Sequence, residues 1–274
     1  MPRTQLTPDS ATIARWRAAG RGHGEGITYH PWLTVQDVPS TSFSHRIDGL
    51  KTQRVHHLLS TLELAFFYLA EWSPLVVDIR EQYPLFEVEE TCLIAERCGL
   101  WHPLHPTDRT PLVLTTDFLL TVQRDGERVL LARTIKPTKD LSQRMLEKFE
   151  IERRYWAARG ISWKIVTERE LPTTFTQNMH LLHAHYFPDP SWDPDLLRAT
   201  VQMLTDLVLA PHRSLAALAL ICDQRLGCAP GTSLQIAYYL IATWQWQVDL
   251  FVPLQPAQPL TVTGTAIHIP ALNQ

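Results

Sequence analysis

The sequence lacks the long apolar segments that mark membrane proteins and secreted precursors. None of its apolar runs approaches the roughly 18 residues that a membrane-spanning helix needs. The first ten residues, MPRTQLTPDS, contain no apolar stretch that resembles the core of a signal peptide. With 274 residues, 45% hydrophobic and 19% charged, the chain is expected to form one large globular domain or two modest ones. We therefore expect a cytoplasmic protein without a membrane partner.

Cysteine is scarce, and its spacing fits no common metal site. The four cysteines form two C-x5-C pairs, Cys92 with Cys98 and Cys222 with Cys228, whereas zinc sites use shorter separations. The plainer interpretation is that all four are free thiols in a reducing compartment. A zinc site remains the alternative.

Charge is nearly absent from the last part of the chain. Residues 171–274 hold 3 basic and 6 acidic residues, whereas residues 1–170 hold 22 of each sign. From residue 226 onward the only formal charge is Asp249. This shift in composition predicts two domains, one over residues 1–170 and one over residues 171–274.

The first domain contains helices and strands in the order α-β-β-β-α-β. Hydrophobic periodicity predicts a helix, three strands, a helix and a strand, over residues 60–72, 74–86, 112–122, 128–136, 141–159 and 161–167 respectively. A short helix over 9–19 precedes them, and an irregular insertion is expected over 87–110. This order is typical of an α/β fold in which helices pack on the faces of a mixed sheet.

One of the predicted central strands carries an acidic residue. Asp117 lies in LVLTTDFLLTV, although Asp is depleted from half-buried strands. Between this strand and the next stands Asp125-Gly126, a strong hairpin signal. A two-residue turn there pairs Asp117 with Thr134 and puts Lys136 diagonally beside Asp117 on one face. A three-residue or bulged turn would separate the two charges.

A second carboxylate interrupts an apolar helix and has two open interpretations. Glu63 stands in LLSTLELAFFYL, where Ser60-x-x-Glu63 fits a capping box. A glutamate in the first turn can also direct its carboxylate toward a site beside the sheet, and the two roles do not exclude each other. For Asp117 and Lys136, likewise, a plain ion pair is an alternative to a catalytic role.

These residues together resemble those of a nuclease family. A helix with Glu, a hairpin with Asp and Lys, and then a helix and a strand are arranged as in the PD-(D/E)XK, or restriction-endonuclease-like, fold. More specifically, the chain is similar to TnsA, the endonuclease subunit of a heteromeric, cut-and-paste bacterial transposase. The similar segments are PWLTVQDVPS, HRIDGLKTQRVHHLLSTLELAFFYLAEW, VVDIREQYPL, TTDFLL and LEKFEIERRYW. The similarity runs from about residue 20 to 167 and is weaker beyond residue 170.

The resemblance implies a catalytic trio of Glu63, Asp117 and Lys136. It also implies an enzyme of the bacterial cytoplasm that cuts the 5′ strands of transposon-end DNA. Its expected partners are a DDE transposase (TnsB-like) and an AAA+ ATPase regulator (TnsC-like). The expected cofactor is Mg²⁺, which Mn²⁺ can replace, bound by Glu63, Asp117 and the carbonyl of Ile135, since Mg²⁺ prefers hard oxygen ligands.

The chain departs from the superfamily pattern at Thr134. The pattern has a carboxylate two residues before the lysine, and a hydroxyl is a poorer metal ligand. A catalytically degenerate nuclease fold that acts as a scaffold or docking protein in the transposition complex therefore remains an alternative. A stand-alone restriction-type or junction-cleaving nuclease is another.

Two further predictions concern DNA. The basic cluster of Arg46, Lys51, Arg54, His56 and His57 precedes the Glu63 helix and is expected to contact phosphates, with a solvated face as the alternative. The second domain is predicted to be winged-helix-like, with helices over 193–209, 213–225 and 232–244 and then two strands. Because it has almost no basic residues, we expect it to dock onto a protein rather than DNA.

Overall fold

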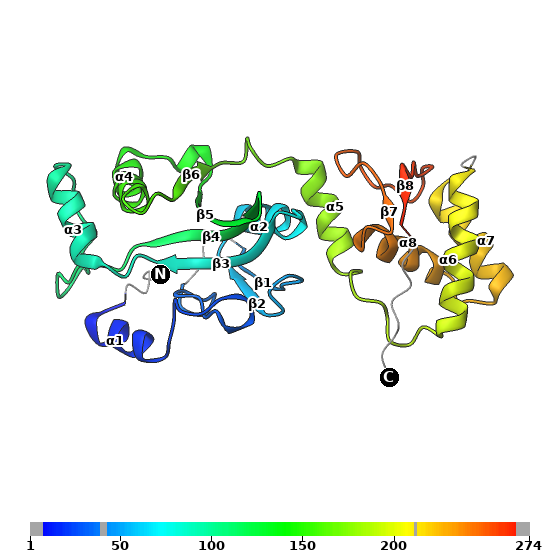
Figure 1. The fold of residues 1–274 in the computed structure, drawn as a ribbon, viewed down its shortest axis with the longest axis horizontal. Helices are drawn as coiled ribbons and strands as arrows, with labels where there is room; N and C mark the ends of the chain where they lie inside the picture. Colours follow the sequence, from blue (N-terminus) through cyan, green and yellow to red (C-terminus); the bar gives the residue numbers. More distant parts are fainter. Residues whose placement is uncertain (1–7, 39–42, 211–212, 267–274) are drawn as a thin grey trace, which may run out of the picture. The chain divides into compact units, whose positions relative to one another are not determined.

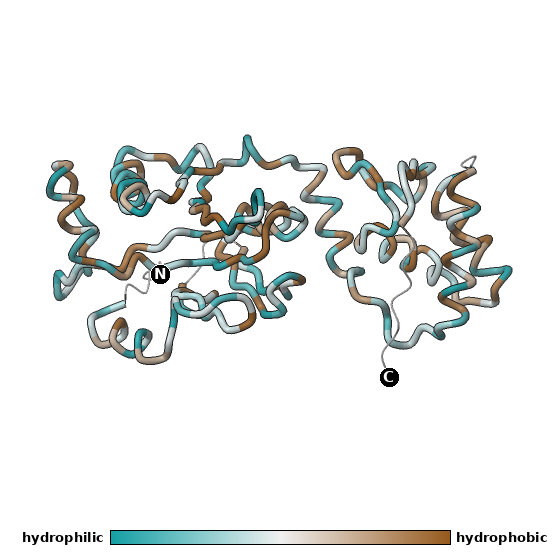
Figure 2. The backbone as a smooth tube through the Cα atoms, viewed as in Figure 1, coloured by the Kyte–Doolittle hydropathy of each residue, from teal (hydrophilic) through white to brown (hydrophobic). Residues whose placement is uncertain are grey.

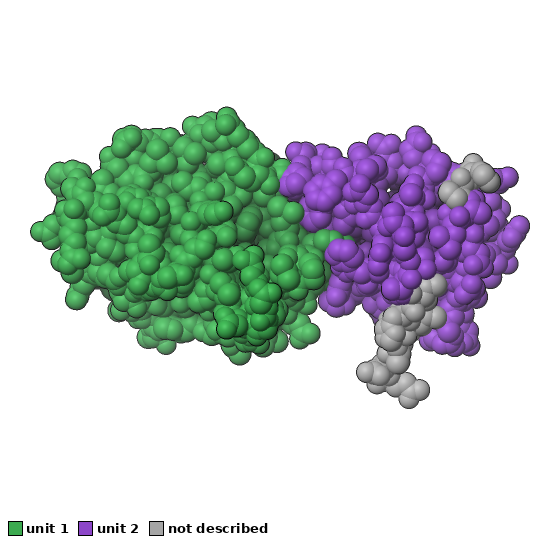
Figure 3. Space-filling model, turned by 45° about the horizontal axis from the view of Figure 1, so that its top comes forward, with its two compact units in different colours: residues 1–171 green, residues 172–274 purple. Residues whose placement is uncertain are grey.

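A computed structural model describes residues 8–38, 43–210 and 213–266. The chain divides into two compact units, Met1–Leu171 and Pro172–Gln274, and each is described by itself (Figure 3). Within the described ranges, no helix combines the length and the apolar character that crossing a bilayer would require.

A four-stranded mixed sheet forms the centre of the first unit (Figure 1). Its strands, in spatial order, are β3 (Val76–Pro84), β4 (Thr115–Arg124), β5 (Glu127–Ile135) and β6 (Ser162–Val166). Only β5 and β6 pair in parallel, and α4 (Gln143–Ala157) connects them, since parallel neighbours need a crossover. The α/β class predicted from the sequence is confirmed.

The hairpin between β4 and β5 has the register that its turn residues predict. Asp125 and Gly126 both have positive φ, 52° and 85°, as the type I′ turn of a two-residue hairpin requires. The ladder continues from this turn to the pair Phe118–Arg133. Asp117 lies one residue beyond that last pair, where the hairpin opens.

Helices cover both faces of the sheet. On one face α4 and α3 (Val88–Arg97) pack over β4 and β5. The buried core there consists of Leu85, Ala95, Leu114, Leu119, Ala132, Ile151, Tyr155 and Trp156. On the other face α2 (Thr61–Trp72) places Phe66 against Phe118, with 5.0 Å between the ring centroids.

The helix α3 corrects the prediction of an irregular insertion over residues 87–110. It buries only two residues, Thr91 and Ala95, and its remaining positions are mostly charged or half-exposed. The helix is amphipathic, since its buried Thr91 and Ala95 stand four positions apart on one face. The prediction was therefore wrong for Val88–Arg97.

The chain before α2 packs along β3. It comprises α1 (Ser10–Ala18), the short helix η1 (Gly26–Thr28) and the antiparallel pair β1 (His45–Asp48) and β2 (Val55–Leu58). Gly22 lies where a Cβ atom would stand 2.3 Å from a side-chain carbon of Pro84, and its φ is +79°. Only glycine allows the loop to approach the end of β3 so closely.

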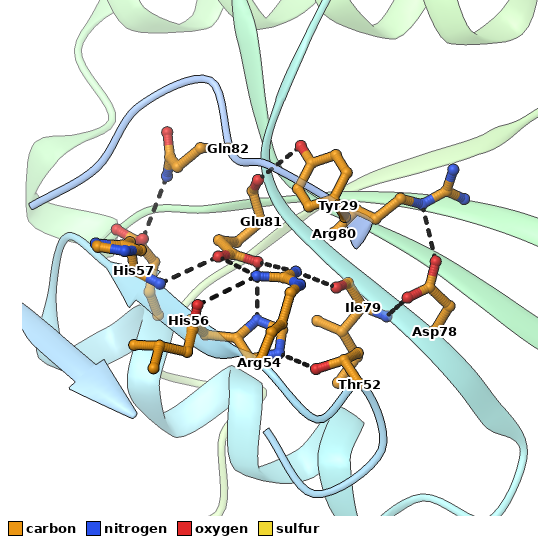
Figure 4. Close-up of polar contacts among 12 residues, drawn as sticks. Tyr29, Thr52, Arg54, His56, His57, Asp78, Ile79, Arg80, Glu81 and Gln82 are labelled. Carbon is orange, nitrogen blue, oxygen red and sulfur yellow. Dashed lines mark hydrogen bonds and ion pairs between the residues drawn. The ribbon is translucent and has the colours of Figure 1, made fainter. Parts of the chain in front are cut away.

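A buried ion-pair network joins β2 to β3 (Figure 4). The Glu81 carboxylate of β3 is fully buried and accepts hydrogen bonds from both terminal nitrogens of Arg54, at 2.8 and 2.6 Å. His56 Nδ1 lies 2.8 Å from the same carboxylate, and the backbone N–H of His57 donates to it at 3.1 Å. Burial by itself would raise the pKa of Glu81, but His56 and Arg54 hold it well below its ordinary value.

The structure corrects the prediction of a basic cluster for DNA at Lys51, Arg54 and His56. Arg46 is exposed and His57 is half-buried, so for these two the contact with phosphates stays a prediction. The side chain of Arg54 is 8% exposed and that of His56 is 0% exposed. The Lys51 ammonium donates to the carbonyls of Ser73 and Val76. The sequence shows these positive charges but not the distant buried acceptors that bind them.

The second unit is mainly helical, as predicted. It contains α5 (Thr173–His183), α6 (Pro194–Leu209), α7 (Leu215–Leu226) and α8 (Thr232–Ala242). Asp193 caps α6 by accepting from two backbone N–H groups, and Pro194 occupies the first turn. Hydrophobic residues recur along α6 and α7, brown in Figure 2, and α8 is almost wholly buried.

Two details of the second unit differ from the prediction. The helix α5 was not expected. The strands β7 (Trp246–Gln247) and β8 (Gly264–Thr265) do pair in antiparallel fashion, but each spans only two residues in the part of the chain that is described.

The first prediction tests the buried network. Arg54→Met removes one partner of a buried ion pair and leaves Glu81 uncompensated, which typically costs about 3–5 kcal/mol. The free energy of unfolding, measured by urea titration, is expected to fall by this amount.

Arg153→Ala is the control, since Arg153 pairs with Glu150 on the exposed face of α4. An exposed pair of this kind contributes about 0–1 kcal/mol. Equal losses of unfolding free energy in the two variants would show that the buried pair contributes no more to stability than the exposed one.

Candidate active site

Glu63 performs the capping role that its sequence context predicts. It occupies the third position of α2, where its backbone N–H donates to Ser60 Oγ at 3.1 Å. Its carboxylate accepts from the Ser60 hydroxyl at 2.9 Å and from the Leu59 N–H at 2.9 Å. The side chain is buried, with 6% of its surface exposed.

The same carboxylate is also linked to Asp117. The link is the side-chain amide of Gln82, a residue that the sequence analysis missed. Gln82 Nε2 lies 3.3 Å from Glu63 Oε2 and 3.3 Å from Asp117 Oδ1. These two carboxylate oxygens are therefore separated by no more than twice that distance. The cap and the site-directed role of Glu63 occur together, as one of the sequence-based interpretations allows.

Ile135 and Lys136 reach this place from the end of β5. The Ile135 N–H donates to Asp117 Oδ2 at 2.7 Å. Because the N–H and C=O of one strand residue point to the same side, the Ile135 carbonyl faces this edge as well. Lys136 follows directly, and its N–H donates to the Val166 carbonyl of β6 at 3.0 Å. The predicted residues thus converge where the sheet opens.

The two carboxylates destabilise each other's charged form. Burial, and then the charge of Asp117, raise the pKa of Glu63 to about 8. Burial also raises the pKa of Asp117, although the Ile135 N–H and the positive charges of Lys148 and Lys136 act in the opposite direction. The site therefore holds less positive charge than its two carboxylates require.

Comparison with known proteins agrees with this geometry. A model of the TnsA-like endonuclease N-terminal domain matches residues 73–168, and a model of the TnsA endonuclease C-terminal domain matches residues 170–250. The chain belongs to the TnsA endonuclease family. The resemblance inferred from the sequence is thereby confirmed.

One curated relative within the TnsA family is the transposition protein TnsA of transposon Tn7 from Escherichia coli. It is 47% identical over 174 residues, which cover 63% of this chain and 62% of the relative. The match thus spans less than two thirds of the relative's length. The N-terminal TnsA model includes Gln82, Asp117, Ile135 and Lys136, whereas Glu63 precedes its matched range.

A third carboxylate of this TnsA-family chain lies beside Thr134 and was also missed. Glu152 of α4 is fully buried and accepts hydrogen bonds from Thr134 Oγ1 at 2.8 Å and Thr116 Oγ1 at 3.1 Å. Burial raises its pKa to about 7, with Lys148 acting against the shift. A carboxylate from a neighbouring helix thus lies within hydrogen-bond distance of the Thr134 hydroxyl.

The sequence contains a weak signal for Glu152 but none for its environment. Glu152 stands in LEKFEIERRYW, where several charged residues follow each other along one helix. Its neighbour Glu150 is exposed and pairs with Arg153 and Arg154. Only the packing of α4 on the sheet distinguishes the buried glutamate from the exposed one.

The ligand set fits a hard divalent cation. Within residues 8–38, 43–210 and 213–266, no three His, Cys, Asp or Glu side chains form a metal-binding group, and all four cysteines are free. The site has only two such side chains. A cation bound there would have as ligands the carboxylates of Glu63 and Asp117 and, in addition, the Ile135 carbonyl. All are oxygen donors, which suit Mg²⁺ and Mn²⁺, and a cation would offset the charge that raises the pKa of both acids.

The second prediction uses the pH dependence of Glu152. Its pKa is near 4.5 when unfolded and about 7 in the fold, so the metal-free protein loses stability as the pH rises between these values. In Glu152→Gln the side chain cannot ionise, so the variant does not lose stability in this way. Its free energy of unfolding at pH 8 is expected to exceed that of the wild type by roughly 3 kcal/mol, with no difference at pH 4.

The exposed Glu127 of β5 is a matched control, because Glu127→Gln is expected to give no such pH-dependent gain. Urea titration at pH 4, 6 and 8 measures the three free energies. A gain at pH 8 that persists unchanged at pH 4 would contradict the assignment of a raised pKa to Glu152.

Proposed function

We propose that this protein is a metal-dependent DNA endonuclease that cuts the 5′ strands at the ends of a transposon. The observation that carries the proposal is the meeting of Glu63 and Asp117 at Gln82, beside Lys136, in a member of the TnsA endonuclease family. A metal ion held by such carboxylates can stabilise the charge on a scissile phosphate and lower the pKa of a bound water, as phosphodiester hydrolysis requires.

Each protein residue has a distinct role in the proposed reaction. Glu63 and Asp117 hold the metal, and the Ile135 N–H fixes the orientation of Asp117. Mg²⁺, when bound, supplies positive charge for the scissile phosphate and makes a water molecule more acidic. Lys136 orients or deprotonates the attacking water, or stabilises the charge that develops on the phosphate.

The proposed reaction requires partners, because each transposon end has two strands. A DDE transposase of the TnsB kind would cut the 3′ ends, and an AAA+ ATPase of the TnsC kind would regulate the complex in the bacterial cytoplasm. The relative from Escherichia coli is named as a transposition protein, which supports a place in such a complex.

The second unit has the surface of a docking domain. Residues 171–274 contain only Arg198, Arg213 and Arg225 as basic residues. Phe251 and Val252 expose 64% and 56% of their surfaces. Exposed aromatic and apolar side chains with few charges are typical of protein interfaces and unsuited to phosphates.

A catalytically degenerate scaffold is the second candidate, and Thr134 is the observation that favours it. Glu152 weakens this alternative, because its buried carboxylate lies 2.8 Å from the Thr134 hydroxyl. A stand-alone nuclease would differ from both by cutting DNA without any partner.

The third prediction tests the catalytic assignment. Asp117→Ala and Lys136→Ala are each expected to abolish 5′-strand cleavage of transposon-end DNA, assayed with the partner transposase and Mg²⁺. Both side chains lie at the open end of the hairpin, so the melting temperature and the binding of the partner are expected to persist. Full cleavage by either variant would mean that the trio is wrongly assigned.

The matched controls are Asp108→Ala, from a loop, and Lys139→Ala, from the short 3-10 helix Thr138–Asp140. Both are expected to cleave like the wild type. If the wild type itself fails to cleave with every partner present while still assembling with them, the scaffold alternative is correct.

The fourth prediction concerns the second unit. A fragment of residues 171–274 is expected to bind duplex DNA weakly, because it can neutralise few phosphates. It is expected to bind the transposase or the ATPase in a pull-down or by calorimetry. Tight, salt-sensitive binding to transposon-end DNA without partner binding would overturn the docking role.

A further inference from the structure

We propose that Gln82 is a positioning residue that holds Glu63 and Asp117 as a preformed pair of metal ligands. This inference rests on the proposed function and adds to it a residue outside the predicted trio. Its basis is the place of the Gln82 amide between two carboxylates that belong to different elements, α2 and β4.

The chemistry of the amide allows only one orientation here. Both neighbours of the Gln82 side chain are carboxylate oxygens, each 3.3 Å away, and a carboxylate accepts hydrogen bonds. The NH₂ group has two donors, one for each acid. The side chain is 2% exposed, so water does not compete for these bonds.

The backbone of Gln82 is strained in a way that serves this contact. Its φ is +49°, a left-handed value that is unusual for a residue with a side chain. The residues on either side remain in the ladder, since Glu81 pairs with Phe118 and Tyr83 pairs with Thr116. A strained residue between two regular ones indicates that its side-chain direction is needed.

Several bonds from the N-terminal part of the chain keep the strained segment in place. The Gln82 carbonyl accepts from the Trp32 N–H at 3.3 Å, and the Glu81 carbonyl accepts from the Tyr29 hydroxyl at 3.0 Å. On the other side of the backbone, the Glu81 carboxylate is held by Arg54 and His56 (Figure 4). The direction of the Gln82 side chain is therefore set by its surroundings.

A neutral amide is suited to this position because it donates without cancelling charge. A lysine or arginine at 82 would form a lasting ion pair with the two carboxylates and would compete with a cation. A glutamate would add a third negative charge and no donor. Glutamine brings the two acids together and leaves their charge available for a metal.

The fifth prediction compares two substitutions that remove the donor in different ways. Gln82→Met keeps the length of the side chain, whereas Gln82→Gly also relieves the left-handed backbone. The full-length chain is titrated with Mn²⁺ alone and the bound ion is counted by electron paramagnetic resonance. Both variants are expected to bind Mn²⁺ about 10–100-fold more weakly than the wild type, as is usual when a residue that orients metal ligands is lost.

Thermal stability separates a positioning role from a merely structural one. In the presence of EDTA, Gln82→Gly is expected to melt close to the wild-type temperature, because relief of the backbone offsets the lost hydrogen bonds. If Gln82 only supported the fold, Gln82→Gly would melt lower and bind Mn²⁺ like the wild type, which would overturn the proposal. In cleavage assays the half-saturating Mg²⁺ concentration should rise more than the maximal rate falls.

Two further variants make the outcomes distinguishable. Gln123→Met, at a half-buried position of β4 away from the site, is the matched control and should bind Mn²⁺ like the wild type. Asp117→Ala reports on the proposed metal site itself. Loss of binding in Asp117→Ala but not in the Gln82 variants overturns the role of Gln82 alone. Unchanged binding in Asp117→Ala overturns the metal site and this inference together.

Discussion

The Glu81 carboxylate has no contact with solvent. It is bound by His56 of β2 and by Arg54, which directly precedes β2, so both partners lie 25 or more residues earlier in the chain. Such a buried pair adds little net stability compared with apolar packing, but breaking it is costly, so it strongly favours one arrangement of β2 against β3. The Tyr29 hydroxyl and the Trp32 N–H bind the carbonyls of this same part of β3. The residue that follows Glu81 is Gln82, and the candidate active site depends on its position.

The site that results is unfavourable for the metal-free protein. Glu63, Asp117 and Glu152 gather near one end of the sheet, and burial raises the pKa of all three. A fold selected only for stability would place apolar residues here. Acidic side chains with shifted pKa values, held in a fixed geometry, are common in functional sites, because a bound ligand or cation supplies the positive charge that the carboxylates lack. The raised pKa values and the strained Gln82 backbone are therefore two separate indications of a functional site at this end of the sheet.

The two units contribute different surfaces to one protein of the TnsA endonuclease family. The first carries nearly all of the positive charge and the carboxylate site, and the second carries few charges. This separation is consistent with the proposal that the first unit binds DNA and the second binds proteins. Thr134 stands where the superfamily pattern has a carboxylate. The Glu152 carboxylate of α4 accepts a hydrogen bond from Thr134, so a carboxylate lies close to this position in the fold although none stands there in the sequence.

Features that depend on neighbouring residues could be predicted from the amino-acid sequence alone. Asp125-Gly126 specifies the hairpin register, and Ser60 with Glu63 specifies a helix start, because turns and caps are bonds between residues a few positions apart. Which charged side chains are buried depends instead on the packing of the folded chain. Arg54 was expected to face DNA but binds Glu81, and the local sequence did not reveal the place of Gln82 between two acids or the burial of Glu152. The roles of these three residues arise from contacts between segments that are distant in the chain. Whether such a side chain is buried depends on how strands and helices pack, and not on its neighbours in the sequence.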